Sequence, residues 1–155
     1  EVAHMTASGF VLNRERTKAL MVYHNIYDSW SWTGGHADGE TDLLGVAIRE
    51  VREETGTETV NLVGEGIFSL DVLPVLAHEK KGKYVAAHLH LSVAYLLEAD
   101  EKEPLRMKAD ENSGVKWIPL EQVVESSSEP HMQIIYGRFL ERIKNRKIKG
   151  ERDGF

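Results

Sequence analysis

Three glutamates lie close together in the segment Arg49–Gly56, at a spacing that suits the binding of a divalent cation. If the segment is helical, Glu50 neighbours both Glu53 and Glu54, because residues three and four positions apart share a helix face. Their carboxylates then span about 6 Å along the axis, at 1.5 Å per residue. Like charges this close repel, whereas a hard cation reverses that penalty by binding carboxylate oxygens. The alternative is a solvated, Glu-rich helix face, which is common in soluble proteins.

The pattern around these glutamates predicts an amphipathic helix from about Asp42 to Thr55. Thr41 or Asp42 can cap the N-terminus of this helix, and Gly56 is suited to end it. Apolar or small residues recur at spacings of three and four, which indicates one buried stripe. The members of this stripe are Leu44, Ala47, Ile48, Val51 and Thr55.

A longer pattern that includes this helix resembles the Nudix box, G-x5-E-x7-R-E-U-x-E-E-x-G-U, where U is a bulky aliphatic residue. The residues that match at the family spacings are Gly35, Arg49, Glu50, Val51, Glu53, Glu54 and Gly56. Two positions depart from the motif. The position of the motif's first glutamate is occupied by Thr41, and the glutamate, Glu40, comes one residue earlier. At the last motif position the chain has Thr57, where the family prefers an aliphatic residue.

The resemblance to the Nudix hydrolases implies both a reaction and roles for these residues. The implied reaction is metal-dependent hydrolysis of a diphosphate (pyrophosphate) linkage in a nucleoside diphosphate derivative, in which water attacks phosphorus. Glu50, Glu53 and Glu54, with the carbonyl of Gly35, are the implied ligands of Mg2+ or Mn2+. The alternative role that the resemblance implies for Glu50 is that of the base that activates water. Glu53 is also in the implied catalytic set, and Arg49 positions a glutamate of the site.

A further acid often comes from a loop near the end of the domain in this family. Glu111 is the candidate, because the segment Asp110–Trp117 resembles the family's turn into a strand of the form V-x-W-x-P-L. Asp110 and Glu101 are competing carboxylates, and a solvated loop position is the alternative. We expect Glu111 to join the metal ligands.

Three histidines are candidate substrate contacts. His36 follows Gly35 directly, where it could meet a substrate phosphate or be a polar loop residue. His88 and His90 are two residues apart on a predicted strand and therefore share a face. Two such histidines can ligate a metal, but no third ligand is evident nearby. A place in the substrate cleft is therefore favoured over a metal site, with a solvated face as the alternative.

The elements that must position these residues are mostly strands. The predicted strands are Thr6–Asn13, Ala19–Tyr23, Val60–Val63, Ile67–Val72, Tyr84–Leu97 and Val115–Pro119. A second helix is predicted from about His131 to Asn145, with Ile134, Ile135, Phe139, Leu140 and Ile143 facing the core. Gly34 and Gly35 predict a turn before the first helix. This order predicts an α+β fold, a Nudix-like α/β/α sandwich with a mixed β-sheet between helices.

Composition limits the classes of function. The chain of 155 residues is 41% hydrophobic and 28% charged, which fits one domain, 1–155, with 146–155 as a frayed basic tail. Its formal net charge of −6 disfavours binding to duplex nucleic acid. No apolar run approaches the ~20 residues that span a bilayer, and Glu1–Ala7 lacks a signal-peptide pattern. With no cysteine, the sequence favours a cytoplasmic location.

Two other functions are known on the same fold. Isopentenyl diphosphate isomerase relies on a cysteine, which this chain lacks. A non-catalytic sensor of a nucleotide or ADP-ribose-like ligand is disfavoured, because such proteins typically lose a glutamate of the box. The expected partner is a small-molecule diphosphate substrate, and a homodimer is compatible because many relatives dimerise. The box does not determine the substrate, since other loops and strands recognise the leaving group.

Overall fold

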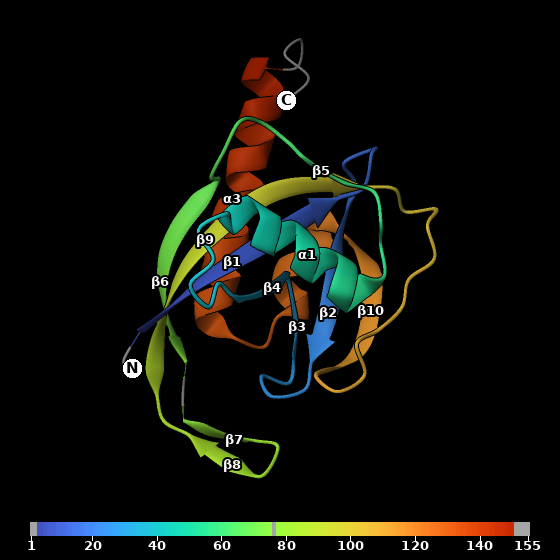
Figure 1. Ribbon diagram of the computed structural model, residues 1–155. Helices are drawn as coiled ribbons and strands as arrows, with labels where there is room; N and C mark the ends of the chain where they lie inside the picture. Colours follow the sequence, from blue (N-terminus) through green and yellow to red (C-terminus); the bar gives the residue numbers. More distant parts are fainter. Residues whose placement is uncertain (1–2, 76, 151–155) are drawn as a thin grey trace.

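The computed structural model describes residues 3–75 and 77–150, in which a mixed β-sheet lies between two helices (Figure 1). The strands of the sheet are β1 (Ala3–Leu12), β2 (Lys18–His24), β3 (Ser29–Ser31), β4 (Thr33–His36), β5 (Val60–Leu62), β6 (Ser69–Val75), β9 (His88–Ala99) and β10 (Asn112–Pro119). A separate hairpin consists of β7 (His78–Lys80) and β8 (Lys83–Val85). The helices are α1 (Leu43–Thr55), α2 (Val123–Ser126) and α3 (Pro130–Gly150), with a 3-10 turn, η1, at Leu120–Gln122.

Strands β1 and β9 form the centre of the sheet and are parallel along their paired length, from Ala3↔Leu89 to Leu12↔Glu98. The middle of β1, from Thr6 to Gly9, also pairs with β4, and its end pairs with β2. Strand β9 pairs with β6 and then with β5, and all of these pairs are antiparallel. The mixed sheet confirms the predicted fold class and brings three distant segments, β4, β1 and β9, side by side.

Helix α1 covers one face of the sheet with the apolar stripe that the sequence predicts. Val46, Ala47 and Val51 are buried in one core cluster with residues of β1 and β9. The side chain of Asp42 accepts a 3.0 Å hydrogen bond from the backbone N–H of Gly45, so Asp42 is the N-cap. Gly56 ends the helix with a φ of 79°, in the left-handed region that glycine adopts readily.

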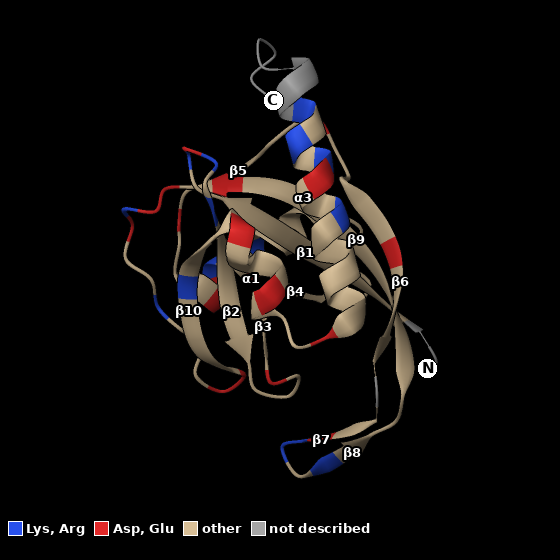
Figure 2. Ribbon diagram, turned by 180° about the vertical axis from the view of Figure 1, so that it is seen from behind, with Lys and Arg blue, Asp and Glu red and all other residues tan. Residues whose placement is uncertain are grey.

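Helix α3 covers the opposite face (Figure 2). Ile135, Phe139 and Ile143 are buried at a spacing of four, as predicted, and Tyr136 is fully buried beside them. The prediction for Ile134 was wrong, because this side chain is 71% exposed. Ile134 is two positions from both Met132 and Tyr136, which are buried, so at 3.6 residues per turn it points about 160° away from each and faces solvent.

The C-terminal part of α3 extends to Gly150, past the predicted end at Asn145. Lysines and arginines gather along the second half of α3 up to residue 146 (Figure 2). Residues 151–155 of the predicted basic tail lie outside the described part of the chain. No helix within 3–75 or 77–150 is long and apolar enough to cross a membrane.

Each of the six predicted strands has somewhat different bounds in the structure; β1 and β10, for example, each begin three residues earlier than predicted. The predicted strand Tyr84–Leu97 is divided, because β8 ends at Val85 and β9 begins at His88. Both faces of the middle of β9 are covered, so Ser92 and Ala94 are buried as well as Val93 and Tyr95. The predicted strand Ile67–Val72 corresponds to β6, which begins two residues later and runs to Val75.

Candidate functional site

Gly34 and Gly35 lie within β4 and not in the turn that the sequence predicted. Their strand partners on β1 are Ser8 and Ala7, which the local sequence pattern cannot reveal. The backbone N–H of Gly34 donates a 3.0 Å hydrogen bond to Oε1 of Glu54 on α1. A Cβ built on Gly35 would lie 2.7 Å from both Cδ and Oε1 of Glu50. The two glycines therefore let the strand approach the helix glutamates closely.

Glu54 is deeply buried, with 4% of its surface exposed. Its Oε2 accepts a 3.3 Å hydrogen bond from Nδ2 of Asn112, at the start of β10. Burial raises the pKa of Glu54 to about 8, and the charge of Glu50 adds to the rise, although the hydrogen bonds from Gly34 and Asn112 oppose it. A carboxylate held here in its charged form would be stabilised by a cation.

Glu50 lies one helical turn before Glu54, with 15% of its side chain exposed. Burial, and then the charge of Glu53, raises the pKa of Glu50. Nε of Arg49 lies 3.8 Å from Oε2 of Glu50, but the Arg49 side chain is half exposed, so this ion pair is weak. Glu53 is exposed at the solvent side of the same helix. The structure thus brings the predicted glutamates and Arg49 together, with different degrees of burial.

The segment before β10 reaches the same helix. The charge of Glu111 contributes to the raised pKa values of Glu50 and Glu54. Oε1 of Glu111 lies 3.6 Å from Nζ of Lys80, on the β7–β8 hairpin. Burial lowers the pKa of Lys108, but the charges of Glu111 and Glu50 outweigh it, so that the net direction is upward. This side of the site therefore contains both carboxylates and lysines, and their charges partly offset one another.

The two competitors of Glu111 make other contacts. Glu101 accepts a 3.1 Å hydrogen bond from Nζ of Lys18, at the start of β2. Asp110 is half exposed, and its Oδ2 lies 3.9 Å from Nζ of Lys81. Glu111 is thus the candidate whose charge acts on the helix glutamates. Its neighbour Asn112, which hydrogen-bonds Glu54, carries no signal in the sequence pattern.

The two departures from the motif occupy different environments. Glu40 is exposed in the loop between β4 and α1, where its backbone N–H donates a 2.9 Å hydrogen bond to the carbonyl of Ala37. Thr57 is fully buried just after the helix, so this motif position keeps a packing role without an aliphatic side chain.

The donors on α1 and β10 fit a hard divalent cation. Glu50 and Glu54 supply carboxylate oxygens, which Mg2+ and Mn2+ prefer, and Gly35 lies against one of them. Oδ1 of Asn112 is buried without a hydrogen-bond partner among the described residues. Burial and mutual repulsion disfavour the ionised forms of Glu50 and Glu54. A bound cation would offset both of these effects.

The three predicted substrate histidines lie in one cluster. His36 follows Gly35 in β4, so its side chain points to the sheet face opposite α1. Nε2 of His90 lies 3.3 Å from Nε2 of His36 and 3.2 Å from Nε2 of His88. Burial lowers the pKa of His90 to about 4, and the charges of its histidine neighbours add to the effect.

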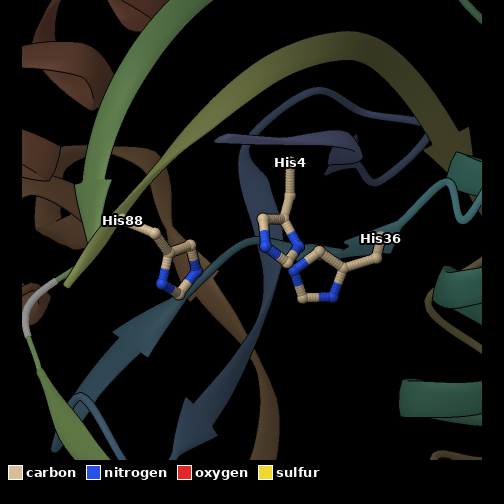
Figure 3. Close-up of side chains that lie close together, drawn as sticks. All are labelled: His4, His36 and His88. Carbon is tan, nitrogen blue, oxygen red and sulfur yellow. The ribbon is translucent and has the colours of Figure 1, made fainter. Parts of the chain in front are cut away.

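A fourth histidine, which the sequence analysis missed, completes this cluster. The ring centroid of His4 lies 4.9 Å from that of His36 and 4.7 Å from that of His88 (Figure 3). His4 is next to His90 because β1 and β9 are parallel and pair these residues. Only the register of two strands far apart in the sequence could have revealed this neighbour.

Residues 3–142 match the family model of the NUDIX domain. The chain belongs to the Nudix family. This confirms the resemblance on which the predicted roles rest. Among similar proteins, the RNA pyrophosphohydrolase of Pelagibacter ubique (strain HTCC1062) is 33% identical over 100 residues, or 62% of this Nudix chain and 63% of that protein. The match therefore spans less than two thirds of the length of that relative.

Solved structures share the Nudix fold at low sequence identity. A binary complex of C. elegans Ap4A hydrolase has a TM-score of 0.66 and 18% identity, covering 92% of this chain and 98% of that one. The NUDIX domain of Shewanella oneidensis NrtR, complexed with ADP ribose, has a TM-score of 0.61 and 15% identity. The match covers 92% of this chain and 90% of that one. At these identities the likeness establishes the fold alone.

Proposed function

We propose that this Nudix chain is a metal-dependent pyrophosphohydrolase that cleaves a diphosphate linkage in a nucleoside diphosphate derivative. The observation that carries the proposal is the packing of Glu50 and Glu54 against the glycines of β4. An uncompensated buried carboxylate is unfavourable, and a second carboxylate beside it increases the penalty. A site that binds divalent cations and substrate phosphates accounts for this arrangement.

Glu50, Glu53 and Glu54, with the carbonyl of Gly35 and with Glu111, would hold Mg2+ or Mn2+. When bound, the cation would neutralise the diphosphate oxygens and make an attacking water more acidic. This ligand set contains only oxygen donors, as hard cations require.

The chain's own residues then have distinct tasks. The N–H of Gly34 and Nδ2 of Asn112 hold the two oxygens of Glu54 in place. Glu50 accepts the proton of the attacking water, and its burial makes the carboxylate more basic. A new bond forms between the water oxygen and phosphorus, and the anhydride P–O bond breaks, which releases two phosphate-bearing products. Arg49 positions Glu50 through the contact at 3.8 Å.

The substrate class follows from chemistry that the relatives share. The names of the relatives specify RNA and Ap4A, and the NrtR domain is complexed with ADP ribose. We propose a small molecule with a nucleotide anhydride as the substrate, and a cytoplasmic location. The bound ADP ribose also supports the alternative, a sensor that binds such a ligand without cleaving it. The roles of His36, His88 and His90 as substrate contacts stay a prediction.

The test is turnover of a panel containing Ap4A, ADP ribose and an RNA with a 5′-terminal triphosphate, with Mg2+, Mn2+ or a chelator. We expect metal-dependent release of phosphate-ester products from at least one compound. Glu53→Gln and Glu54→Gln should each lower turnover by at least roughly tenfold to a hundredfold, the usual effect of disturbing even the groups that orient a metal ligand. Glu58→Gln is the matched control, because Glu58 is exposed just beyond the same helix.

Two outcomes would contradict this proposal at different levels. Tight binding of ADP ribose without turnover of any compound would favour the sensor. Unchanged turnover and metal affinity in both Glu53→Gln and Glu54→Gln would show that the hydrolytic site lies elsewhere.

A further inference from the structure

We propose that His4, His36, His88 and His90 form a second cation site, which binds a transition metal ion of the Zn2+ class. The labelled side chains of His4, His36 and His88 point toward one another in Figure 3. This histidine cluster is separate from the glutamates of α1, because Gly35 and His36 direct their substituents to opposite faces of the sheet. The proposal does not depend on the proposed hydrolase activity.

The sheet topology places these imidazoles on one face. Strand β1 lies between β4 and β9, and His4 pairs with His90 in parallel register. His36 pairs with Thr6, two residues along β1 from His4 and therefore on the same face. His88 precedes His90 by two residues on β9. Three strands thus contribute to one cluster, which is held by backbone pairing and not by a mobile loop.

Two of the distances between ring nitrogens match those of tetrahedral coordination. Zn2+ binds histidine nitrogen at about 2.0–2.1 Å, so two ligand nitrogens of a tetrahedral site are about 3.3–3.4 Å apart. Nε2 of His90 lies 3.3 Å from Nε2 of His36 and 3.2 Å from Nε2 of His88. One nitrogen each of His4, His36 and His88 also lie within 4.8 Å of one another.

The hydrogen bonds of His88 prepare it as a ligand. Nδ1 of His88 lies 2.9 Å from the carbonyl oxygen of Ala86, which can only accept a hydrogen bond. In the neutral ring the proton therefore resides on Nδ1, and the lone pair of Nε2 faces His90. A carbonyl that fixes the tautomer in this way is a usual partner of metal-bound histidine.

Without a metal, Nε2 of His90 cannot form good hydrogen bonds with both of its histidine neighbours. Nε2 of His90 faces two other Nε2 atoms, yet a ring nitrogen offers either one proton or one lone pair. It can therefore form only one good hydrogen bond with its two neighbours. A cation at the centre would replace these competing contacts with several nitrogen–metal bonds.

The chemistry of the donors distinguishes this site from the glutamate site. Imidazole nitrogen suits Zn2+, Co2+, Ni2+ and Cu2+, whereas carboxylates suit Mg2+ and Mn2+. The charge of Asp38 raises the pKa of His36 and the charge of Lys80 lowers it, so these two effects partly cancel. The four histidines are partly exposed, so an ion can reach them from solvent.

Titration of the whole chain with Co2+ in excess Mg2+ tests the proposal, since tetrahedral Co2+ absorbs visible light strongly and octahedral Co2+ does so weakly. We expect one equivalent of Co2+ to produce the strong band and Zn2+ to displace it. His88→Gln and His90→Gln should each abolish the band, and His4→Gln should weaken it. Glu53→Gln should retain it, and so should His131→Gln, a partly exposed histidine on α3 that serves as the matched control.

Several results would overturn the inference. A weak band that appears only when Mg2+ is left out would mean that Co2+ binds only the glutamates. A raised KM in His90→Gln, with no Co2+ site in the unaltered chain, would make the cluster a substrate contact. If the histidine variants fail to fold, X-ray absorption of the unaltered Zn2+-loaded chain decides, because the number of imidazole ligands is then measured directly. Fewer than three would contradict the proposal.

Discussion

The side-chain amide of Asn112 donates a 3.3 Å hydrogen bond to Oε2 of Glu54, joining the start of β10 to the end of α1. The other oxygen of Glu54 accepts from the backbone of Gly34 in β4. Donors from two strands therefore fix the orientation of one buried helical carboxylate. The fold therefore orients Glu54 before any cation binds. As a result, this side chain loses little orientational freedom when a cation does bind.

Replacement of Asn112 by alanine should weaken the glutamate site. Glu54 would lose a donor in a buried setting, which should lower the free energy of unfolding by about 1–3 kcal/mol. The apparent affinity for Mg2+ should fall by about tenfold to a hundredfold, as for other groups that orient metal ligands. Urea denaturation and the Mg2+ dependence of turnover measure these effects. Ser113→Ala, at the exposed neighbouring position, is the control, and equal behaviour of the two variants would count against this role.

Gly35→Ala should separate activity from stability. The new Cβ would lie 2.7 Å from the Glu50 carboxylate, so the end of that side chain must move while the backbone need not. Turnover should fall by roughly tenfold to a hundredfold, since displacement of a reacting group is costly. Thermal unfolding should change little. Gly66→Ala is the matched control, because a Cβ there meets no atom within 4 Å. Full activity of Gly35→Ala would show that the position of Glu50 is not critical.

The stability of the metal-free protein should decrease as the pH rises from 6.5 to 8. The pKa of Glu54 is raised by burial from its ordinary 4.5 to about 8. In this window the unfolded chain has released the proton and the folded chain retains it, so deprotonation favours unfolding. The contribution is at most about 1.4 kcal/mol per pH unit. Urea denaturation in a chelator should show the slope, and Glu54→Gln should reduce it. Identical slopes in the two proteins would contradict the assignment.

Tyr136→Phe should destabilise the fold without disabling the glutamate site. The Tyr136 hydroxyl is buried and accepts a 3.0 Å hydrogen bond from the backbone N–H of Trp32. Its loss leaves that N–H without this acceptor, which should lower the free energy of unfolding by about 1–3 kcal/mol. Mg2+ affinity should stay the same, because Tyr136 lies on the α3 side of the sheet. Tyr84→Phe is the control, since Tyr84 is 73% exposed and should tolerate the change.

The sequence alone was sufficient where the determining interactions are local. Helix α1, its Asp42 cap and its Gly56 terminus follow from residues three or four positions apart, and so does the convergence of the glutamates. The match to the Nudix box also lies within one short segment. These features depend on helix geometry and on the residues themselves, so they could be predicted before any tertiary contact was known.

Only the tertiary structure decided what surrounds those residues. Glu53 and Glu54 are adjacent in the sequence, yet Glu53 is exposed, whereas Glu54 is buried and accepts hydrogen bonds from Gly34 and Asn112. His4 joins His90 only through the parallel register of β1 and β9. Strand pairing and burial depend on partners far away along the chain, and no local periodicity encodes which partners meet.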